Sequence, residues 1–241
     1  MSRRAVILAG GRGSRLAPYT TVLPKPLLPV GDRAILDVVV RQLRRTGFDD
    51  LTIAVGHLAH LIGAVFGDGS EHGVRIAYHE ERSPRGTAGP LATIDGLDDT
   101  FLMLNGDVLT TLDFRALYDA HKAAGNALTI ATHRREVFID YGVLHTDGDH
   151  RLLAYEEKPT LAYTVSMGVY ALEPRVRAHV PADRPFDLPD LVQALLAAGE
   201  PVGAYPYDGY WLDIGRHDDY EQAIAEFDGL LPDLLPGEPP A

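Results

Sequence analysis

The sequence predicts an α/β fold built on a doubly wound, mixed sheet. Residues 5–8 and 101–104 are continuous apolar runs, which are typical of strands buried on both faces of a parallel sheet. In the first half of the chain, helical patterns separate such runs, and the connections between them are short. This alternation is the pattern of strand–helix units wound onto both faces of one sheet.

The first half is expected to supply most of the parallel sheet and its covering helices. The strands expected there are residues 5–8, 51–55, 74–78 and 101–104. The helices expected there are residues 35–43, 60–66 and 89–97. The first of these helices has apolar residues at helical spacing and is followed by Gly47, a typical stop signal.

The second half is richer in strands, which should extend or flank the sheet. The strands expected there are residues 127–133, 141–145, 152–155 and 165–170, and the helices are residues 188–198 and 218–227. We therefore predict one domain over residues 1–228, with its two halves meeting near residue 110. Residues 229–241 are proline-rich and acidic, and are predicted to form a C-terminal tail that is loosely ordered at its end.

Composition narrows the classes of function. The 22 Lys+Arg and 34 Asp+Glu give a formal net charge of −12, which argues against nonspecific binding to nucleic acid or an acidic membrane. The chain has no cysteine, hence no disulfide, thiol nucleophile or cysteine metal site. No apolar stretch reaches the length of about 18 residues needed to span a bilayer, and the N-terminal run is too short for a signal peptide. We expect a cytoplasmic protein, and a homo-oligomer is compatible with the sequence.

A glycine-rich segment directly follows the first strand, at the edge of the sheet where open α/β folds bind ligands. Gly10, Gly11 and Gly13 let the backbone approach phosphate groups and turn its N–H groups towards an anion. The spacing differs from both the dinucleotide fingerprint and the Walker A loop. Arg15 adds positive charge, and Lys25 lies between two prolines that stiffen its loop. The combination predicts a polyphosphate site, whereas a lone glycine turn would not.

The segment from Leu8 to Pro29, LAGGRGSRLAPYTTVLPKPLLP, resembles the opening signature of the sugar-1-phosphate nucleotidyltransferases, closest in form to mannose-1-phosphate guanylyltransferase-like members. The resemblance runs from about residue 5 to about residue 227, and it implies a Rossmann-like nucleotide-diphospho-sugar transferase fold with sugar-binding β insertions. Further matches follow in the family's order at residues 86–89, 105–107, 141–143, 157–159, 166–170 and 211–215.

The resemblance implies a site for two substrates. The nucleoside triphosphate would be bound by Leu8, Ala9, Gly10, Gly11, Gly13, Ser14, Arg15, Lys25, Glu81, Gly86, Thr87 and Ala88. The sugar phosphate would be bound by Asn105, Tyr141, Gly142, Glu157, Lys158, Ser166 and Gly168. Many relatives have Asn where this chain has Ser166. The catalytic residues would be Arg15, Lys25, Asp107 and Lys158.

Two carboxylates are candidate ligands of Mg²⁺. Asp107 ends the fourth strand near the glycine loop, and Asp213 lies in another apolar run, so both could meet at the phosphates. The resemblance assigns both residues this role. On the residues alone, a turn or N-cap role for Asp107 and a backbone hydrogen bond for Asp213 are the simpler interpretations.

The choice of base depends on Glu81. Guanine presents two donors on its Watson–Crick edge, which suit a carboxylate, and so Glu81 favours GTP. The other interpretation makes Glu81 a surface loop residue and leaves the base to backbone groups of residues 8–11. We expect GTP and mannose 1-phosphate, or a related heptose or cyclitol phosphate. The runner-up is a thymidylyl- or uridylyltransferase acting on glucose 1-phosphate.

Two other classes of protein fit the sequence less well than such a nucleotidyltransferase. A catalytically silent regulatory subunit that binds nucleotide sugars should have lost Lys25, Asp107 or Asp213, and all three are present. An NAD-binding oxidoreductase should carry the dinucleotide fingerprint, which is missing. The ten histidines are scattered without a metal-ligand spacing, so most are expected at the surface or in packing.

Overall fold

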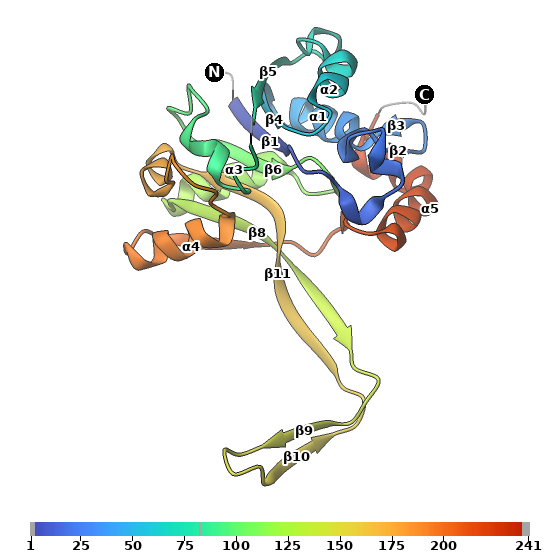
Figure 1. Ribbon diagram of the computed structural model, residues 1–241, viewed down its shortest axis with the longest axis vertical. Coiled ribbons are helices and arrows are strands. Elements are labelled where there is room, and N and C mark those ends of the chain that lie inside the picture. Colours follow the sequence, from blue (N-terminus) through green and yellow to red (C-terminus); the bar gives the residue numbers. More distant parts are fainter. Residues whose placement is uncertain (1–2, 82, 238–241) are drawn as a thin grey trace.

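A central mixed sheet organises the protein in the computed structural model, which describes residues 3–81 and 83–237 (Figure 1). Its strand order is β12-β8-β11-β6-β1-β4-β5, and β11 runs antiparallel to both of its neighbours whereas the other pairs are parallel. The doubly wound, mixed α/β fold expected from the sequence is therefore confirmed. The strands are β1 Arg3–Ala9, β4 Phe48–Val55, β5 Arg75–Glu80, β6 Phe101–Asn105, β8 Leu128–Phe138, β11 Thr160–Leu172 and β12 Val202–Pro206.

Helices cover both faces of this sheet. On one face, α1, α2 and α3 pack against alternate residues of β1 such as Ile7, and on the other face α4 packs near Val6. Successive side chains of a strand point to opposite faces, so an all-apolar run such as residues 5–8 fits a strand buried on both sides. The helices are α1 Ile35–Arg45, α2 Ala59–Phe66, α3 Phe114–Ala124, α4 Leu188–Ala197 and α5 His217–Leu234.

Short strand pairs complete the architecture beside the main sheet. They are β2 Pro29–Val30 with β3 Arg33–Ala34, β7 Val108–Thr110 with β13 Trp211–Asp213, and β9 Val143–Thr146 with β10 Leu152–Glu156. The β7–β13 pair matters most for function. It brings a strand from residue 211 onward next to the segment that directly follows β6, although 100 residues separate the paired Trp211 and Thr110.

One expected helix is shorter in the structure, and one observed helix was not expected. The segment at residues 89–97 forms only a short 3-10 helix, Gly89–Ala92. Its carbonyls are bound instead by a side chain, because the Arg177 guanidinium donates to Leu91 O and Ile94 O at 2.9 and 2.8 Å. Helix α3 was not predicted, and it begins at an N-cap where the Asp113 carboxylate accepts from the backbone of Arg115 and Ala116.

The predicted C-terminal tail must be corrected, because helix α5 extends into it. Residues 229–234 continue α5, and Leu231, Leu234 and Leu235 are buried in a third core cluster beside α1. Proline at position 232 lies inside this helix. Prolines and acidic residues favoured a loosely ordered tail, but the leucines between them are buried in this cluster. The last part of the predicted tail, residues 238–241, lies outside the described residues.

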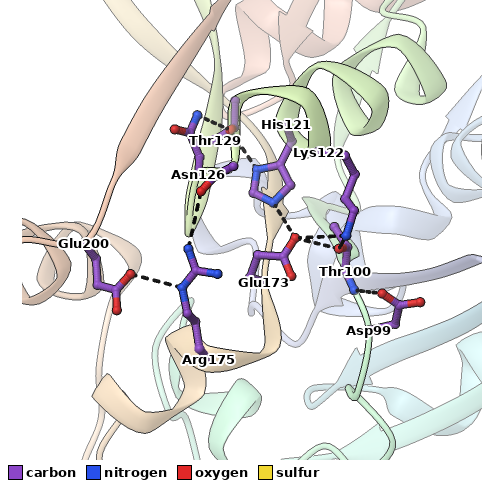
Figure 2. A network of polar contacts seen from close by, with 10 residues as sticks. Asp99, Thr100, His121, Lys122, Asn126, Thr129, Glu173, Arg175 and Glu200 are labelled. Atoms are coloured by element: carbon purple, nitrogen blue, oxygen red, sulfur yellow. Dashed lines mark hydrogen bonds and ion pairs between the residues drawn. The ribbon is translucent and has the colours of Figure 1, made fainter.

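A buried polar network anchors α3 at the edge of the sheet opposite the glycine loop (Figure 2). His121 Nδ1 lies 2.8 Å from Thr129 Oγ1, and its Nε2 lies 3.4 Å from the Glu173 carboxylate. Burial lowers the pKa of His121, so the ring is neutral at pH 7. Lys122 Nζ donates to Thr100 Oγ1 at 2.8 Å in the same network. This histidine therefore has the packing role expected for most of the histidines.

Residues 133–165 form an arm that leaves the body of the protein (Figure 1). Strands β8 and β11 stay paired far beyond the sheet, from Leu172 opposite Leu128 to Thr160 opposite Phe138. The β9–β10 pair lies at the end of this ribbon. Among the described residues, no helix is long and apolar enough to cross a membrane.

Candidate active site

The glycine loop follows β1 at the carboxyl edge of the parallel strands, as predicted. Gly13 has φ +61°, and Thr20 Oγ1 donates to Gly13 O at 2.8 Å. A Cβ at Gly13 would lie 2.8 Å from Thr20 Cγ2, so only glycine fits this turn. Gly11 is exposed, and a Cβ there would meet nothing within 4 Å. The loop is thus fixed at Gly13 and open to a ligand at Gly11.

Lys25 and Asp107 form a direct ion pair between Nζ and Oδ2. Lys25 is only 9% exposed, which is rare for a lysine that lacks a fixed role. The second carboxylate oxygen of Asp107 is buried and has no hydrogen-bond partner among the described residues. A buried, unpaired carboxylate oxygen is costly unless a cation or donor reaches it.

Asp213 lies beside this pair because β13 pairs with β7. Asp213 is opposite Val108, and Ile214 N donates to Asp107 O at 3.2 Å. Partial burial and the charge of Asp107 raise the pKa of Asp213, whereas Lys25 and Arg15 lower it. Four charged groups are therefore close enough to act on one another, as the sequence predicted for the phosphate and metal site.

The two carboxylates are a suitable but incomplete set of metal ligands. The described residues contain no group of three or more histidines and carboxylates that could hold a metal ion alone. Mg²⁺ typically takes one or two carboxylates and completes its octahedron with water and substrate phosphates. Asp107 has an unpartnered oxygen, and Asp213 carries a charge that its surroundings disfavour. Both observations fit a cation that arrives with a nucleotide.

A cavity of about 300 Å³ opens next to these charges. Glu81 lies on its wall, where its Oε2 accepts from Arg85 N at 3.0 Å. Burial raises the pKa of Glu81, and the bond from Arg85 partly offsets this. The cavity is lined by Leu8, Gly10, Gly11, Glu81, Pro84, Arg85, Gly86, Thr87, Asn105 and Asp107. Half of the residues predicted for the nucleotide, six of twelve, thus share one cavity, and two more, Ala9 and Ala88, are buried.

The wall at residues 85–89 is held by a segment a hundred residues away. Asp187 Oδ1 accepts from Thr87 N at 2.9 Å, and Thr87 Oγ1 accepts from Leu188 N at 2.8 Å. Phe186 O accepts from the backbone N–H groups of residues 88 and 89. Gly86 has φ +79°, and a Cβ there would lie 2.6 Å from Phe186 O. Asp187 and Phe186 were not predicted as part of the site, because no local signal in the sequence marks a partner this distant.

Three of the residues predicted for the sugar phosphate lie at the root of the arm, near the cavity. Gly168 has φ +74°, and a Cβ there would lie 2.6 Å from Asn105 Nδ2, so the two residues are in contact. Ser166 Oγ lies 2.9 Å from the hydroxyl of Tyr170, whose pKa is raised by burial and by the charge of Asp213. Tyr170 was not predicted, and it links Ser166 to the charged cluster.

The other four predicted residues lie at the far end of the arm. Tyr141 and Gly142 follow β8, and Glu157 and Lys158 precede β11. Lys158 Nζ pairs with Asp140 at 2.7 Å, and Glu157 accepts from the Tyr155 hydroxyl at 2.6 Å. The structure brings these residues together with one another at the end of the β8–β11 ribbon, which projects away from the main sheet (Figure 1).

Comparisons with known proteins agree on one family. The family model described as "Nucleotidyl transferase" matches residues 4–228. A UTP–glucose-1-phosphate uridylyltransferase of Synechocystis is 36% identical over 92% of this chain and 62% of its own length. A mannose-1-phosphate guanylyltransferase of Mycobacterium tuberculosis is 32% identical over 92% of this chain and 64% of its own length. This chain thus spans a little under two thirds of these relatives.

A solved structure shows the same architecture. A Bacillus anthracis protein named as a glucose-1-phosphate thymidylyltransferase, in complex with sucrose, superimposes with a TM-score of 0.76. It is 25% identical, and the match covers 93% of this chain and 94% of that one. The resemblance read from the opening signature is confirmed: this chain belongs to the nucleotidyl transferase family.

Proposed function

We propose that this protein joins a nucleotide to a sugar 1-phosphate. A phosphate oxygen of the sugar 1-phosphate attacks the α-phosphorus of a nucleoside triphosphate, the bond from that phosphorus to the β-phosphate oxygen breaks, and pyrophosphate leaves. The products are a nucleoside-diphosphate sugar and pyrophosphate. No protein nucleophile is required, in keeping with a chain that has no cysteine.

The observation that carries this proposal is the buried Lys25–Asp107 pair beside the glycine loop and Asp213. In such a reaction the protein must neutralise phosphate charge and align the two reactants. The N–H groups of the glycine loop and the Lys25 ammonium would bind the triphosphate. Arg15, which acts on the charge of Asp213, would neutralise the phosphate that becomes pyrophosphate.

Mg²⁺ would be held by Asp107 and Asp213 together with phosphate oxygens. When bound, the ion neutralises phosphate charge and aligns the reacting groups. The carboxylates would set its position, because Asp107 follows β6 of the main sheet and the β7–β13 pair holds Asp213 beside it. Lys25 would stay next to Asp107, with which it is paired.

GTP and mannose 1-phosphate, or a related heptose or cyclitol phosphate, are the substrates we propose first. Glu81 lies on the cavity wall, and a carboxylate there can accept both donors of guanine. The guanylyltransferase relative, which is 32% identical, supports this choice.

A thymidylyl- or uridylyltransferase acting on glucose 1-phosphate is the second candidate, favoured by a specific observation. Glu81 Oε2 already accepts from Arg85 N at 3.0 Å, which leaves fewer acceptor positions on the carboxylate for the two donors of guanine. The uridylyltransferase relative, which is 36% identical, also favours it.

Pyrophosphate release from a matrix of four nucleoside triphosphates and a panel of sugar 1-phosphates tests the proposal. We expect Mg²⁺-dependent release with one preferred pair, and GTP with mannose 1-phosphate as that pair. Preference for UTP or dTTP with glucose 1-phosphate would select the second candidate. Nucleotide binding without release on any pair would contradict the enzyme proposal and favour a binding subunit.

A further inference from the structure

The arm of residues 133–165 exposes an apolar face that one copy of the chain does not cover. Along β11, Leu161, Tyr163 and Val165 alternate with threonines and alanine, so they share one face. Across the ribbon they lie opposite Val137, Arg135 and His133. Such alternation is the pattern of a sheet with one packed and one solvated face. Tyr163 is nevertheless 52% exposed.

This face is continuous with the core of the body. At the root of the ribbon, the His133 ring lies 5.4 Å from the Trp211 ring, and Trp211 donates from Nε1 to Met167 O at 2.9 Å. Met167 and Trp211 belong to the main core cluster. The apolar face is therefore buried at the root of the ribbon, where it packs against the core, and it is exposed farther along the arm, where no other part of the chain packs on it.

The exposed area is as large as a protein interface. The large apolar side chains of the arm that are 42–78% exposed are Val137, Phe138, Tyr141, Leu144, Leu152, Leu153, Tyr155 and Tyr163. Without Phe138, which pairs with Thr160 and so lies on the other face of the ribbon, they expose about four whole side chains, or about 600–800 Å² at about 150–200 Å² each. A stable interface takes about 800 Å² from each partner. An isolated ribbon of two strands is also marginally stable by itself, so the arm needs a partner surface.

The tip of the arm carries polar groups as well as this apolar surface. Lys158 pairs with Asp140, and Glu157 is bonded to Tyr155 next to Gly142. Ser166, at the root, is six residues from Thr160, which is about 20 Å along a strand. The body's cavity of about 300 Å³ is at the lower limit for a ligand site, although two substrates must fit there. The arm thus carries polar groups but no cavity, and the body carries a cavity that lacks these polar groups.

We propose that the protein works as a dimer in which the arm of each copy closes the active site of the other. The tip would add Lys158 and Glu157 to the sugar-phosphate side of the partner's cavity. The inference rests on the proposed function. The arm docks on a second copy of the chain rather than on its own body, because β8 and β11 pair without a break from residue 160 to residue 166. Folding the tip back would break that pairing, whereas reciprocal exchange satisfies the two-fold symmetry of a dimer.

Complementation between two inactive variants tests the exchange. Asp107→Asn disables the body half, and Lys158→Ala disables the arm half. In a purified mixed dimer, the body of the Lys158→Ala copy and the arm of the Asp107→Asn copy form one intact site. We therefore expect about half of the wild-type activity per dimer. The matched control pairs Lys158→Ala with the double variant Asp107→Asn/Lys158→Ala, and should stay inactive.

A cross-link provides a second measurement that needs no activity. Because the natural chain has no cysteine, Tyr141→Cys and Gly11→Cys can be made as single-cysteine variants. Both positions are exposed, and a Cβ at Gly11 meets nothing within 4 Å. A short bis-maleimide added to the mixed variants should give a product of twice the chain mass. Gly229→Cys, on the outer side of α5, replaces Gly11→Cys in the control and should not cross-link.

The outcomes separate this inference from the proposed function. An active wild-type enzyme that stays monomeric, or mixed dimers that regain nothing, would overturn the exchange and leave the proposed function standing. A chain carrying both cysteines that cross-links only within itself would show that the arm closes on its own body. If the wild-type protein releases no pyrophosphate, the proposed function fails, and the cross-link still decides the docking.

Discussion

Two carboxylates at the site have features that cost free energy. One buried Asp107 oxygen has no hydrogen-bond partner among the described residues, and burial and the charge of Asp107 raise the pKa of Asp213. A cation bound by both carboxylates would offset both costs, so its binding should stabilise the protein by mass action.

Asp107→Asn should lower turnover by about 100-fold or more, because metal charge stabilisation is worth several kcal/mol and each 1.4 kcal/mol is tenfold. The fold should survive, since the amide is isosteric. Pyrophosphate release and circular dichroism measure the two effects. Asp119→Asn, which alters only an exposed pair with Arg115, is the matched control and should keep wild-type turnover. Undiminished Mg²⁺-dependent turnover in Asp107→Asn would remove Asp107 from the metal site.

Asp213→Asn should raise the stability of the metal-free protein while abolishing activity. The pKa of Asp213 is higher in the folded than in the unfolded protein, so the folded state binds the proton more tightly. The stability that Asp213 contributes is present below its unfolded pKa and is lost as the pH rises through the folded value. Above the folded pKa the wild type has lost it, and the amide, which cannot ionise, restores it. Urea midpoints over a pH series measure this, and a variant midpoint that never exceeds that of the wild type would contradict it.

Glu81→Gln should move base preference from GTP towards UTP or dTTP. The amide offers both a donor and an acceptor to the base, whereas an ionised carboxylate only accepts. We expect kcat/KM for GTP to fall about tenfold, the value of one hydrogen bond to a charged group. The ratio of kcat/KM values for GTP and UTP is the measurement. An unchanged ratio would assign base recognition to the backbone of residues 8–11.

At the scale of elements, strand pairing and backbone contacts position the site. The β7–β13 pair brings Asp213 to Asp107, and the segment before α4 holds the loop that follows β5. Both contacts join segments about 100 residues apart. The position of Thr87 in the cavity wall therefore depends on contacts such as its hydrogen bond to Asp187.

Asp187→Ala should raise KM for the nucleoside triphosphate about tenfold with little change in kcat. The loss of a charged acceptor costs about 1.5–3 kcal/mol, and this one positions the binding wall rather than the reacting groups. Asp187→Asn keeps an oxygen that can accept from Thr87 N, so it should restore KM. Steady-state kinetics separate the two parameters. If both variants lowered kcat and raised KM to the same extent, the cause would be a folding defect instead.

Leu234→Ala should destabilise the protein by about 2–4 kcal/mol, the usual cost of removing a buried leucine side chain. Leu234 is 2% exposed and packs in the cluster formed by α1 and α5. Leu230→Ala, at a less buried position of the same helix, should cost clearly less. Denaturant unfolding monitored by circular dichroism gives both values. Equal small effects would show that this end of α5 is not part of the core.

At the scale of the whole molecule, the body and the arm divide the candidate residues between them. The nucleotide side is built into the body, and Tyr141, Gly142, Glu157 and Lys158 lie on the arm. A protein divided in this way depends on association, so its activity should depend on its concentration.

Tyr163→Asp should weaken the dimer by about 30-fold or more, because a central aromatic residue of an interface contributes about 2 kcal/mol. Thr164→Asp places the same charge on the opposite face of the same strand and should leave association unchanged. Analytical ultracentrifugation gives the dissociation constants. Equal effects of the two substitutions would exclude the apolar face as the contact surface.

Local sequence patterns were enough to predict much of the fold and the glycine loop and charged residues of the site. Residues 5–8, 35–43 and 101–104 were placed correctly because their apolar spacing reports directly on burial. The glycine loop, Lys25, Asp107 and Asp213 were also expected together, and the structure places them together. The segment at residues 89–97 was misassigned because an arginine from a distant helix binds its carbonyls.

The sequence by itself determined the alternation of strands and helices, the glycine turn and the family, because each depends on residues close together along the chain. Only the tertiary structure decided that Asp187 supports the cavity wall, that α5 extends over the expected tail, and that the arm projects from the body. These features depend on contacts between residues far apart in sequence. Their free energy comes from packing and register, which no local pattern encodes.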